Sequence, residues 1–129
     1  MASDLGADKT ALCTDAMRGA GMPDGESILG SLTNGQKVII EDGVAKLPDR
    51  SAFAGSVATA DRLVRTMINI AGIPLIDAIR MITLTPARIL HVDSQKGSLE
   101  EGKDADIVIF DNQINVTTTI SKGHVIYNQ

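Results

Sequence analysis

The feature that most constrains the fold is one apolar run, residues 10–14 (Thr-Ala-Leu-Cys-Thr), which is followed by helices and not by more strands of its kind. Such a run is typical of a strand in a parallel sheet that is covered on both faces. A buried parallel strand needs a neighbour on each side, and the sequence pattern offers none. The order of segments therefore predicts the tail of a larger α/β protein.

The rest of the first block, up to about residue 55, is predicted to form turns and short strands. Two apolar segments, residues 37–40 and 44–47, flank an Asp42-Gly43 pair. An Asp-Gly pair between apolar segments is the strongest short-range signal of a hairpin. We therefore expect a hairpin over about residues 36–47.

The second block, about residues 56–90, is predicted to be helical. Apolar residues between positions 57 and 71 recur at three- and four-residue steps, as on one face of an amphipathic helix. Gly72 should end this helix and Pro74 should open the next one. Thr85, placed before a proline, is a plausible N-cap of a final short helix.

The third block, about residues 97–129, returns to strands. Residues 105–110 are predicted to form one strand, and residues 116–120 alternate apolar side chains with threonines. Lys122-Gly123 is predicted to make a turn, after which residues 125–127 form a returning strand. We expect a small hairpin-rich sheet that is separate from the first block.

Composition excludes several classes of function. The chain has 129 residues, a net charge of −4, only 2% aromatic residues and no run of Lys or Arg, which argues against nucleic acid and anionic membrane as partners. The single cysteine, Cys13, cannot form an internal disulfide, and this predicts a cytoplasmic protein. No signal peptide is recognisable at the N-terminus, and no apolar run approaches the roughly 20 residues of a membrane span.

Three motifs, in this order, resemble one enzyme family. The first motif is residues 12–17 (Leu-Cys-Thr-Asp-Ala-Met), together with the Gly-Met-Pro-Asp-Gly at residues 21–25. The second motif is Phe53-Ala54-Gly55-Ser56. The third motif is residues 96–108 (Lys-Gly-Ser-Leu-Glu-Glu-Gly-Lys-Asp-Ala-Asp-Ile-Val). The third motif resembles the closing segment of amidohydrolase-superfamily enzymes in general. The ordered set resembles the N-acetylglucosamine-6-phosphate deacetylases in particular, over about residues 9–127.

This resemblance implies a fold. The chain is expected to be α/β: the C-terminal part of a (β/α)8 amidohydrolase barrel, with its last strand and helices, plus part of the small flanking β-sandwich. Residues 1–95 would form the barrel portion, with a hairpin insertion at about 36–47, and residues 96–129 would form C-terminal strands of the sandwich. Residues 10–14 would be the eighth strand, which places Asp15 at the end where barrel enzymes keep their chemistry.

The resemblance also implies a site. Asp15 would be the catalytic general base and acid, which takes a proton from a metal-bound water and delivers it to the leaving amine. Phe53, Ala54 and Gly55 would line the sugar pocket, largely through backbone groups, although relatives often carry a smaller aliphatic residue at position 53. Simpler explanations exist: an aspartate before a glycine-rich loop often caps a turn, and Ser56 can be a helix N-cap. Met17 also lies near the site by homology, but a methionine is more often a packing residue.

The full-length family uses a divalent metal, zinc or similar, and acts on a small-molecule amino-sugar phosphate. The metal is held there by a glutamate and two histidines from earlier segments, so this chain alone is expected to bind none and to be inactive. His91 and His124 lack a second ligand at metal spacing and are expected to be surface or structural residues. Cys13 is expected to be an inert core residue.

Other interpretations stay open. The closing motif also fits a dihydroorotase-like or imidazolonepropionase-like amidohydrolase, and a non-catalytic interaction module is a further alternative. Exposed strand edges and an uncovered apolar helix face predict a homo-oligomer.

Overall fold

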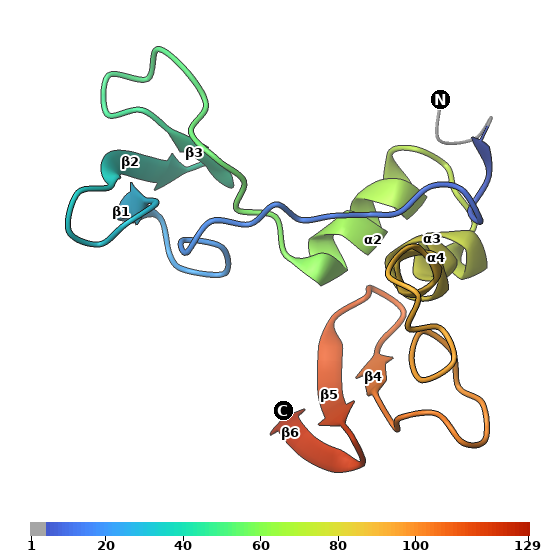
Figure 1. Cartoon of the computed structure of the whole chain (residues 1–129). Helices are drawn as coiled ribbons and strands as arrows, with labels where there is room; N and C mark the ends of the chain where they lie inside the picture. Colours follow the sequence, from blue (N-terminus) through green and yellow to red (C-terminus); the bar gives the residue numbers. More distant parts are fainter. Residues whose placement is uncertain (1–4) are drawn as a thin grey trace. The chain divides into compact units, whose positions relative to one another are not determined.

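The computed structural model describes residues 5–129 of the chain. This part of the chain forms two compact units: Cys13–Leu63 is one, and the described residues up to Leu12 together with Val64–Gln129 are the other. Figure 1 shows the strands and helices of both. Each unit has its own group of buried apolar residues, so each is described by itself.

The Cys13–Leu63 unit contains a three-stranded antiparallel sheet in the order β1-β2-β3. Its strands are β1 (Gly25–Leu29), β2 (Gln36–Glu41) and β3 (Val44–Lys46). The hairpin predicted over residues 36–47 is confirmed: Asp42 and Gly43 join β2 to β3 with φ values of 54° and 70°. Positive φ at both central residues matches the twist of the flanking strands. Strand β1 was not predicted, because its first residues carry no apolar alternation.

One face of this sheet is covered by apolar side chains. Val38 and Ile40 of β2 are 1% and 4% exposed, and Ala45 of β3 is fully buried. Alternate residues of a strand point to the same face, which explains why positions 38 and 40 are buried together. Met17 and Ala54, from outside the strands, complete this core. The core therefore connects the hairpin to the two segments that carry the candidate site residues.

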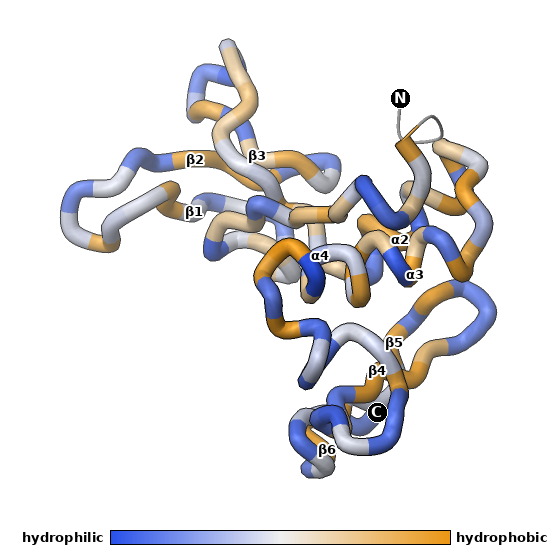
Figure 2. The backbone as a smooth tube through the Cα atoms, turned by 45° about the vertical axis from the view of Figure 1, so that its right-hand side comes forward, coloured by the Kyte–Doolittle hydropathy of each residue, from blue (hydrophilic) through white to orange (hydrophobic). Residues whose placement is uncertain are grey.

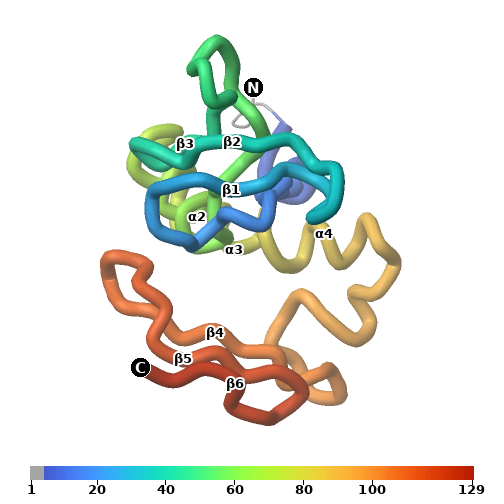
Figure 3. Tube along the Cα trace, turned by 90° about the vertical axis from the view of Figure 1, so that its left-hand side faces the viewer, coloured from blue at the N-terminus to red at the C-terminus, as the bar shows by residue number. Residues whose placement is uncertain are grey.

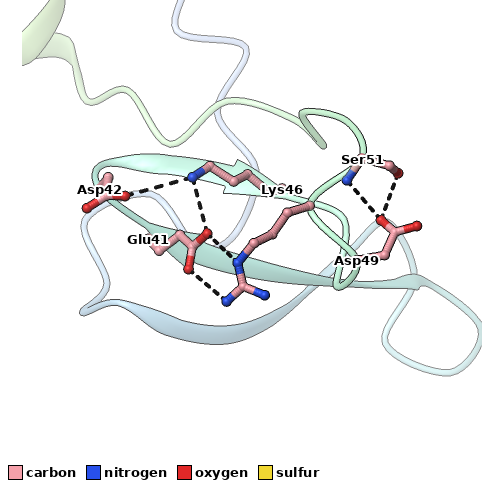
Figure 4. A network of polar contacts seen from close by, with 6 residues as sticks. Glu41, Asp42, Lys46, Asp49 and Ser51 are labelled. Carbon is pink, nitrogen blue, oxygen red and sulfur yellow. Dashed lines mark hydrogen bonds and ion pairs between the residues drawn. The ribbon is translucent and has the colours of Figure 1, made fainter.

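A polar network ties the hairpin to the loop that follows it (Figure 4). The Glu41 carboxylate accepts two hydrogen bonds from Arg50, at 2.9 Å from Nε and 3.1 Å from Nη2. Lys46 Nζ donates to the same carboxylate at 3.1 Å. In the loop, Asp49 Oδ1 accepts hydrogen bonds from the backbone N–H and the hydroxyl of Ser51. The bidentate geometry makes Arg50 the main partner of Glu41.

The three predicted helices are present. They are α2 (Ala60–Asn69), which contains the boundary between the units, α3 (Leu75–Ile82) and α4 (Leu84–Ile89). Figure 2 shows that hydrophobic and hydrophilic positions alternate along them, as in amphipathic helices. Gly72, with a φ of 67°, lies just after α2, and Pro74 occupies the N-cap position of α3. Val64, Ala78 and Ile114 form the buried cluster of this unit.

The predicted N-cap role of Thr85 is wrong. Helix α4 begins at Leu84, with Thr83 at the N-cap position. Thr85 is 1% exposed inside the helix, and its hydroxyl donates to the Ala7 carbonyl at 2.6 Å. The helix can begin ahead of Pro86 because a proline is tolerated in the first turn, where its missing N–H would have no partner in the helix.

The last third of the chain forms a second antiparallel sheet, in the order β4-β5-β6. Figure 3 shows its strands β4 (Ile107–Phe110), β5 (Val116–Ser121) and β6 (His124–Asn128) side by side. The predicted hairpin-rich sheet is therefore confirmed. Before this sheet, Lys96 pairs with Asp104 at 2.7 Å and with Asp106 at 2.5 Å.

Two expectations about the first segment are wrong. Residues 10–14, the predicted strand, form none, because no described strand lies beside them to complete a ladder. The segment is held instead by single contacts, such as the bond from the Leu12 N–H to the Met81 carbonyl at 2.8 Å. Without a sheet around it, Cys13 is exposed and is not a buried core residue. Within the described residues, no helix is both long and apolar enough to cross a membrane.

The Glu41 network predicts a pH dependence of stability. Hydrogen bonds from Arg50, and then from Lys46, hold the pKa of Glu41 below its usual value of 4.5. A carboxyl group whose pKa is lower in the folded state contributes stability that is complete above its unfolded pKa and is lost as pH falls through its folded pKa. We expect Glu41→Gln to lower the free energy of unfolding at pH 7 and to reduce the loss of stability between pH 7 and pH 3.

Urea unfolding at the two pH values measures both effects. The matched control is Glu26→Gln, which makes the same charge change on β1, where Glu26 has no ion pair with another described residue. Parallel pH profiles for the wild-type chain and Glu41→Gln would contradict the role given to the network.

Candidate functional site

Asp15 presents an exposed carboxyl group in an unusual backbone conformation. Its φ is 45°, in the left-handed region that residues other than glycine seldom adopt, although aspartate adopts it more readily than most. Among the described residues, none makes a hydrogen bond or an ion pair with its side chain. The turn-capping explanation of Asp15 requires its carboxylate to accept backbone N–H bonds. The structure shows no such bond, so this explanation is not supported.

The residues after Asp15 connect it to the second motif. Ala16 forms an isolated parallel bridge with Ser56. The next residue, Met17, donates its N–H to the Ser56 carbonyl at 2.8 Å. These contacts bring together two motifs that lie about 40 residues apart in the sequence. All four predicted site residues, Asp15 and positions 53–55, therefore belong to the Cys13–Leu63 unit.

The three residues of the second motif have different environments. Ala54 is 6% exposed, packs in the core, and donates its N–H to the Ala45 carbonyl at 2.9 Å. Phe53 is 78% exposed and forms an isolated antiparallel bridge with Lys46. Gly55 follows with a φ of 89°. The strand β3 thus fixes the backbone of this motif and leaves the Phe53 ring open to solvent.

Gly55 occupies a position where a larger residue would be strained and crowded. A Cβ atom there would lie 3.1 Å from Leu29 Cδ1 and 3.3 Å from Met17 Cγ, closer than ordinary van der Waals contact. Its positive φ is a second reason for glycine at this position. Leu29, at the end of β1, was missed in the sequence. The available signal was the apolar pair Ile28-Leu29 directly before a glycine.

Ser56 does not act as the N-cap of the helix that follows. Helix α2 begins only at Ala60. The Ser56 hydroxyl instead accepts a hydrogen bond from the Ala58 N–H at 3.1 Å, inside the segment that leads to the helix. The N-cap explanation of the second motif is therefore wrong.

The described residues do not fit a catalytic metal centre. No group of three or more His, Cys, Asp and Glu side chains in residues 5–129 is placed to hold a metal ion. A catalytic zinc needs three protein ligands. His91 and His124 are exposed and belong to the unit that does not contain Asp15. Asp15 therefore belongs to no such group among residues 5–129.

Comparison with known proteins defines the class of this chain. The model of the amidohydrolase family matches residues 7–126, which is nearly the whole chain. The chain belongs to the amidohydrolase family. Enzymes of this family are generally metal-dependent.

Several relatives are deacetylases of amino-sugar phosphates. An N-acetylglucosamine-6-phosphate deacetylase of Lysinibacillus sphaericus is 41% identical over 120 residues, covering 93% of this chain and 30% of the relative. A protein of Escherichia coli K12, named provisionally as an N-acetylgalactosamine-6-phosphate deacetylase, is 39% identical over 118 residues, covering 92% of this chain and 68% of the relative. The chain therefore spans about a third or less of a typical full-length relative, with the E. coli K12 protein as a shorter exception.

Solved structures agree with this assignment. The N-acetylglucosamine-6-phosphate deacetylase of Pasteurella multocida superposes with a TM-score of 0.83 at 30% identity, covering 94% of this chain and 31% of that one. An aspartate-to-alanine mutant of the Mycobacterium smegmatis enzyme, in complex with N-acetyl-D-glucosamine-6-phosphate, gives 0.84 at 30% identity, covering 98% and 32%. The expected fold class, a partial α/β amidohydrolase, is confirmed.

The tight environment of Gly55 gives a testable prediction. We expect Gly55→Ala to lower the stability of the chain by about 1 to 3 kcal/mol through its left-handed backbone alone, with a further loss from the contacts with Leu29 and Met17. Gly30→Ala is the matched control, because Gly30 has a φ of 84° and a Cβ there meets nothing within 4 Å. Denaturant unfolding of both variants measures the difference. Equal losses would contradict the packing described for Gly55.

Proposed function

We propose that the protein to which this chain contributes deacetylates N-acetylglucosamine 6-phosphate, giving glucosamine 6-phosphate and acetate. The observation that carries the proposal is the Asp15 carboxyl group, which is exposed, has no side-chain partner among the described residues, and is held beside the Phe53–Gly55 backbone. The amino-sugar phosphate deacetylases among the relatives support the choice of substrate.

Asp15 would act as general base and then as general acid. A carboxyl group with no competing hydrogen bond can accept a proton from the attacking water and return it to the leaving amine. The divalent metal, zinc or similar, belongs to the proposal for the whole protein. No ligand set for it is assigned to this chain, because the described residues supply none.

Phe53, Ala54 and Gly55 would contact the sugar. Ala54 is fixed to β3 and buried, so it anchors the segment that would contact the sugar. Gly55 has no side chain, which lets a ligand approach the backbone closely. The exposed ring of Phe53 would offer an apolar surface to the substrate.

The remaining features of the whole protein are also proposals. Residues 1–95 would belong to the barrel and residues 96–129 to the small β-sandwich. A cytoplasmic location is supported by the single cysteine of this chain, which cannot form a disulfide within it. Exposed apolar residues of β6, such as Val125 and Ile126, support self-association into a homo-oligomer.

The proposal predicts that the isolated chain is inactive and that a completed barrel is active. The purified chain with added zinc or cobalt should release no more acetate from N-acetylglucosamine 6-phosphate than the metal alone. A chimera in which this chain replaces the matching 31% of the P. multocida enzyme should be active. In that chimera Asp15→Asn should lower kcat by about 10²- to 10⁴-fold, because general acid–base catalysis is lost.

Asp24→Asn, an exposed residue of the same loop, is the matched control and should leave kcat within about twofold of the parent chimera. If Asp15→Asn were as active as the control, the catalytic role of Asp15 would be wrong. An interaction module would then be the better interpretation. A panel of other amides, assayed with the same chimera, tests the dihydroorotase-like and imidazolonepropionase-like alternatives.

A second candidate substrate is the galactosamine epimer. The E. coli K12 relative, of which this chain covers 68%, and the E. coli O157:H7 relative, which is 39% identical, are both named for N-acetylgalactosamine 6-phosphate. The two sugars differ in configuration at one carbon, so a pocket that binds that hydroxyl can separate them. The ratio of kcat/KM for the two substrates in the chimera decides between the candidates, and a ratio above one for the galactosamine compound would favour the second.

A further inference from the structure

Met17 joins three segments of the Cys13–Leu63 unit. Its side chain is 9% exposed and belongs to the buried apolar cluster of this unit. Its backbone N–H donates to the Ser56 carbonyl at 2.8 Å, and its carbonyl accepts the Ala20 N–H at 3.0 Å. Both backbone groups of Met17 are therefore bonded, one toward the second motif and one within the loop that follows Asp15.

The sulfur of Met17 makes a polar contact as well. Sδ accepts a hydrogen bond from the Gly19 N–H at 3.2 Å, in a buried position. A Cβ at Gly19 would lie 2.9 Å from this sulfur, so the Gly19 backbone packs directly against it. A thioether is a weak acceptor, yet a buried N–H that loses its partner costs free energy. The loop after Asp15 is thus folded back onto Met17.

Met17 also lies against the glycine of the second motif. The Cβ position of Gly55 is 3.3 Å from Met17 Cγ and 3.5 Å from its Cβ. The contact is made by Met17 Cβ and Cγ, so its Cγ part is lost when the side chain is truncated to Ala and kept by a side chain of similar volume. Truncating Met17 would leave space beneath Gly55 and remove the packing that supports the Ala16–Ser56 bridge.

Asp15 depends on this arrangement, because its own side chain has no partner among the described residues. A left-handed φ at a residue other than glycine persists only where the surroundings fix it. The first residues after Asp15 that bond to another segment are Ala16 and Met17, and both contact Ser56. The backbone conformation that directs the Asp15 carboxyl group outward therefore rests on contacts made by the two residues after it.

We propose that Met17 is a positioning residue, whose side chain holds Asp15 in its left-handed conformation beside Gly55. Its meaning for catalysis rests on the proposed function of Asp15. The conformational effect itself is a property of this chain and is measured without any enzymatic assay.

The test is an NMR measurement of the sign of φ at Asp15 in the full 129-residue chain. We expect a positive φ in the wild-type chain, loss of that preference in Met17→Ala, and its recovery in Met17→Leu, which keeps a similar volume. Val38→Ala is the matched control, because Val38 lies in the same core and its side chain carries no polar atom. It should keep the positive φ even where it lowers stability as much as Met17→Ala.

A second readout separates packing from the sulfur contact. In Met17→Leu the Gly19 amide loses its acceptor, so its hydrogen exchange should be faster by about tenfold or more, while exchange in β2 stays unchanged.

If Met17→Ala does not fold, Met17→Val carries the same φ measurement with a smaller truncation. An unchanged positive φ at Asp15 in the folded truncation variant would show that Met17 is only a packing residue and would overturn the proposal.

In the chimera, Met17→Ala should lower kcat with little change in KM, and Val38→Ala should lower neither. A φ effect in the isolated chain together with an inactive chimera would leave the positioning role intact and count against the proposed function. An active chimera in which Met17→Ala and Val38→Ala have equal kcat would count against the positioning role alone.

Discussion

The candidate site depends on one contact, in which the two residues that follow Asp15 bond to Ser56. One isolated bridge and one hydrogen bond of 2.8 Å bring together motifs that the sequence separates widely. Neither motif forms a helix or a strand at this point, so no regular ladder of hydrogen bonds adds to this contact. The buried cluster of this unit, to which Met17 and Ala54 belong, supplies the packing that makes so few polar contacts sufficient.

The hairpin β2–β3 has a clear structural role in this arrangement. Its strand β3 binds the second motif through the Ala54 N–H and the bridge between Lys46 and Phe53. Its strand β2 supplies Val38 and Ile40, two of the five buried residues of this core. The Glu41 network then ties the loop between β3 and Phe53 to the end of β2, because Arg50 of this loop bonds to Glu41 (Figure 4). A segment that looked like an insertion in the sequence is therefore the support of the candidate site.

The sequence predicted the elements whose signals are local. The Asp42-Gly43 turn, the amphipathic helices and the alternating strands after residue 105 follow from periodicity and turn chemistry, and the structure confirms them. It failed where the outcome depends on distant partners. Residues 10–14 have the composition of a strand, but no strand of the described part of the chain lies beside them, and Cys13 is exposed for the same reason. The contact of Met17 with Ser56 and Gly55 could not be predicted from the sequence. The hydrogen bond joins residues 39 positions apart, and neither motif alone indicates its partner.

The central claim, that Asp15 exchanges the proton in catalysis, is tested most directly by the pH dependence of kcat/KM in the chimera. If Asp15 is the base, the parent chimera should lose rate toward acidic pH, and the residual activity of Asp15→Asn should lack this acidic limb. The same acidic limb in both proteins would show that another group exchanges the proton.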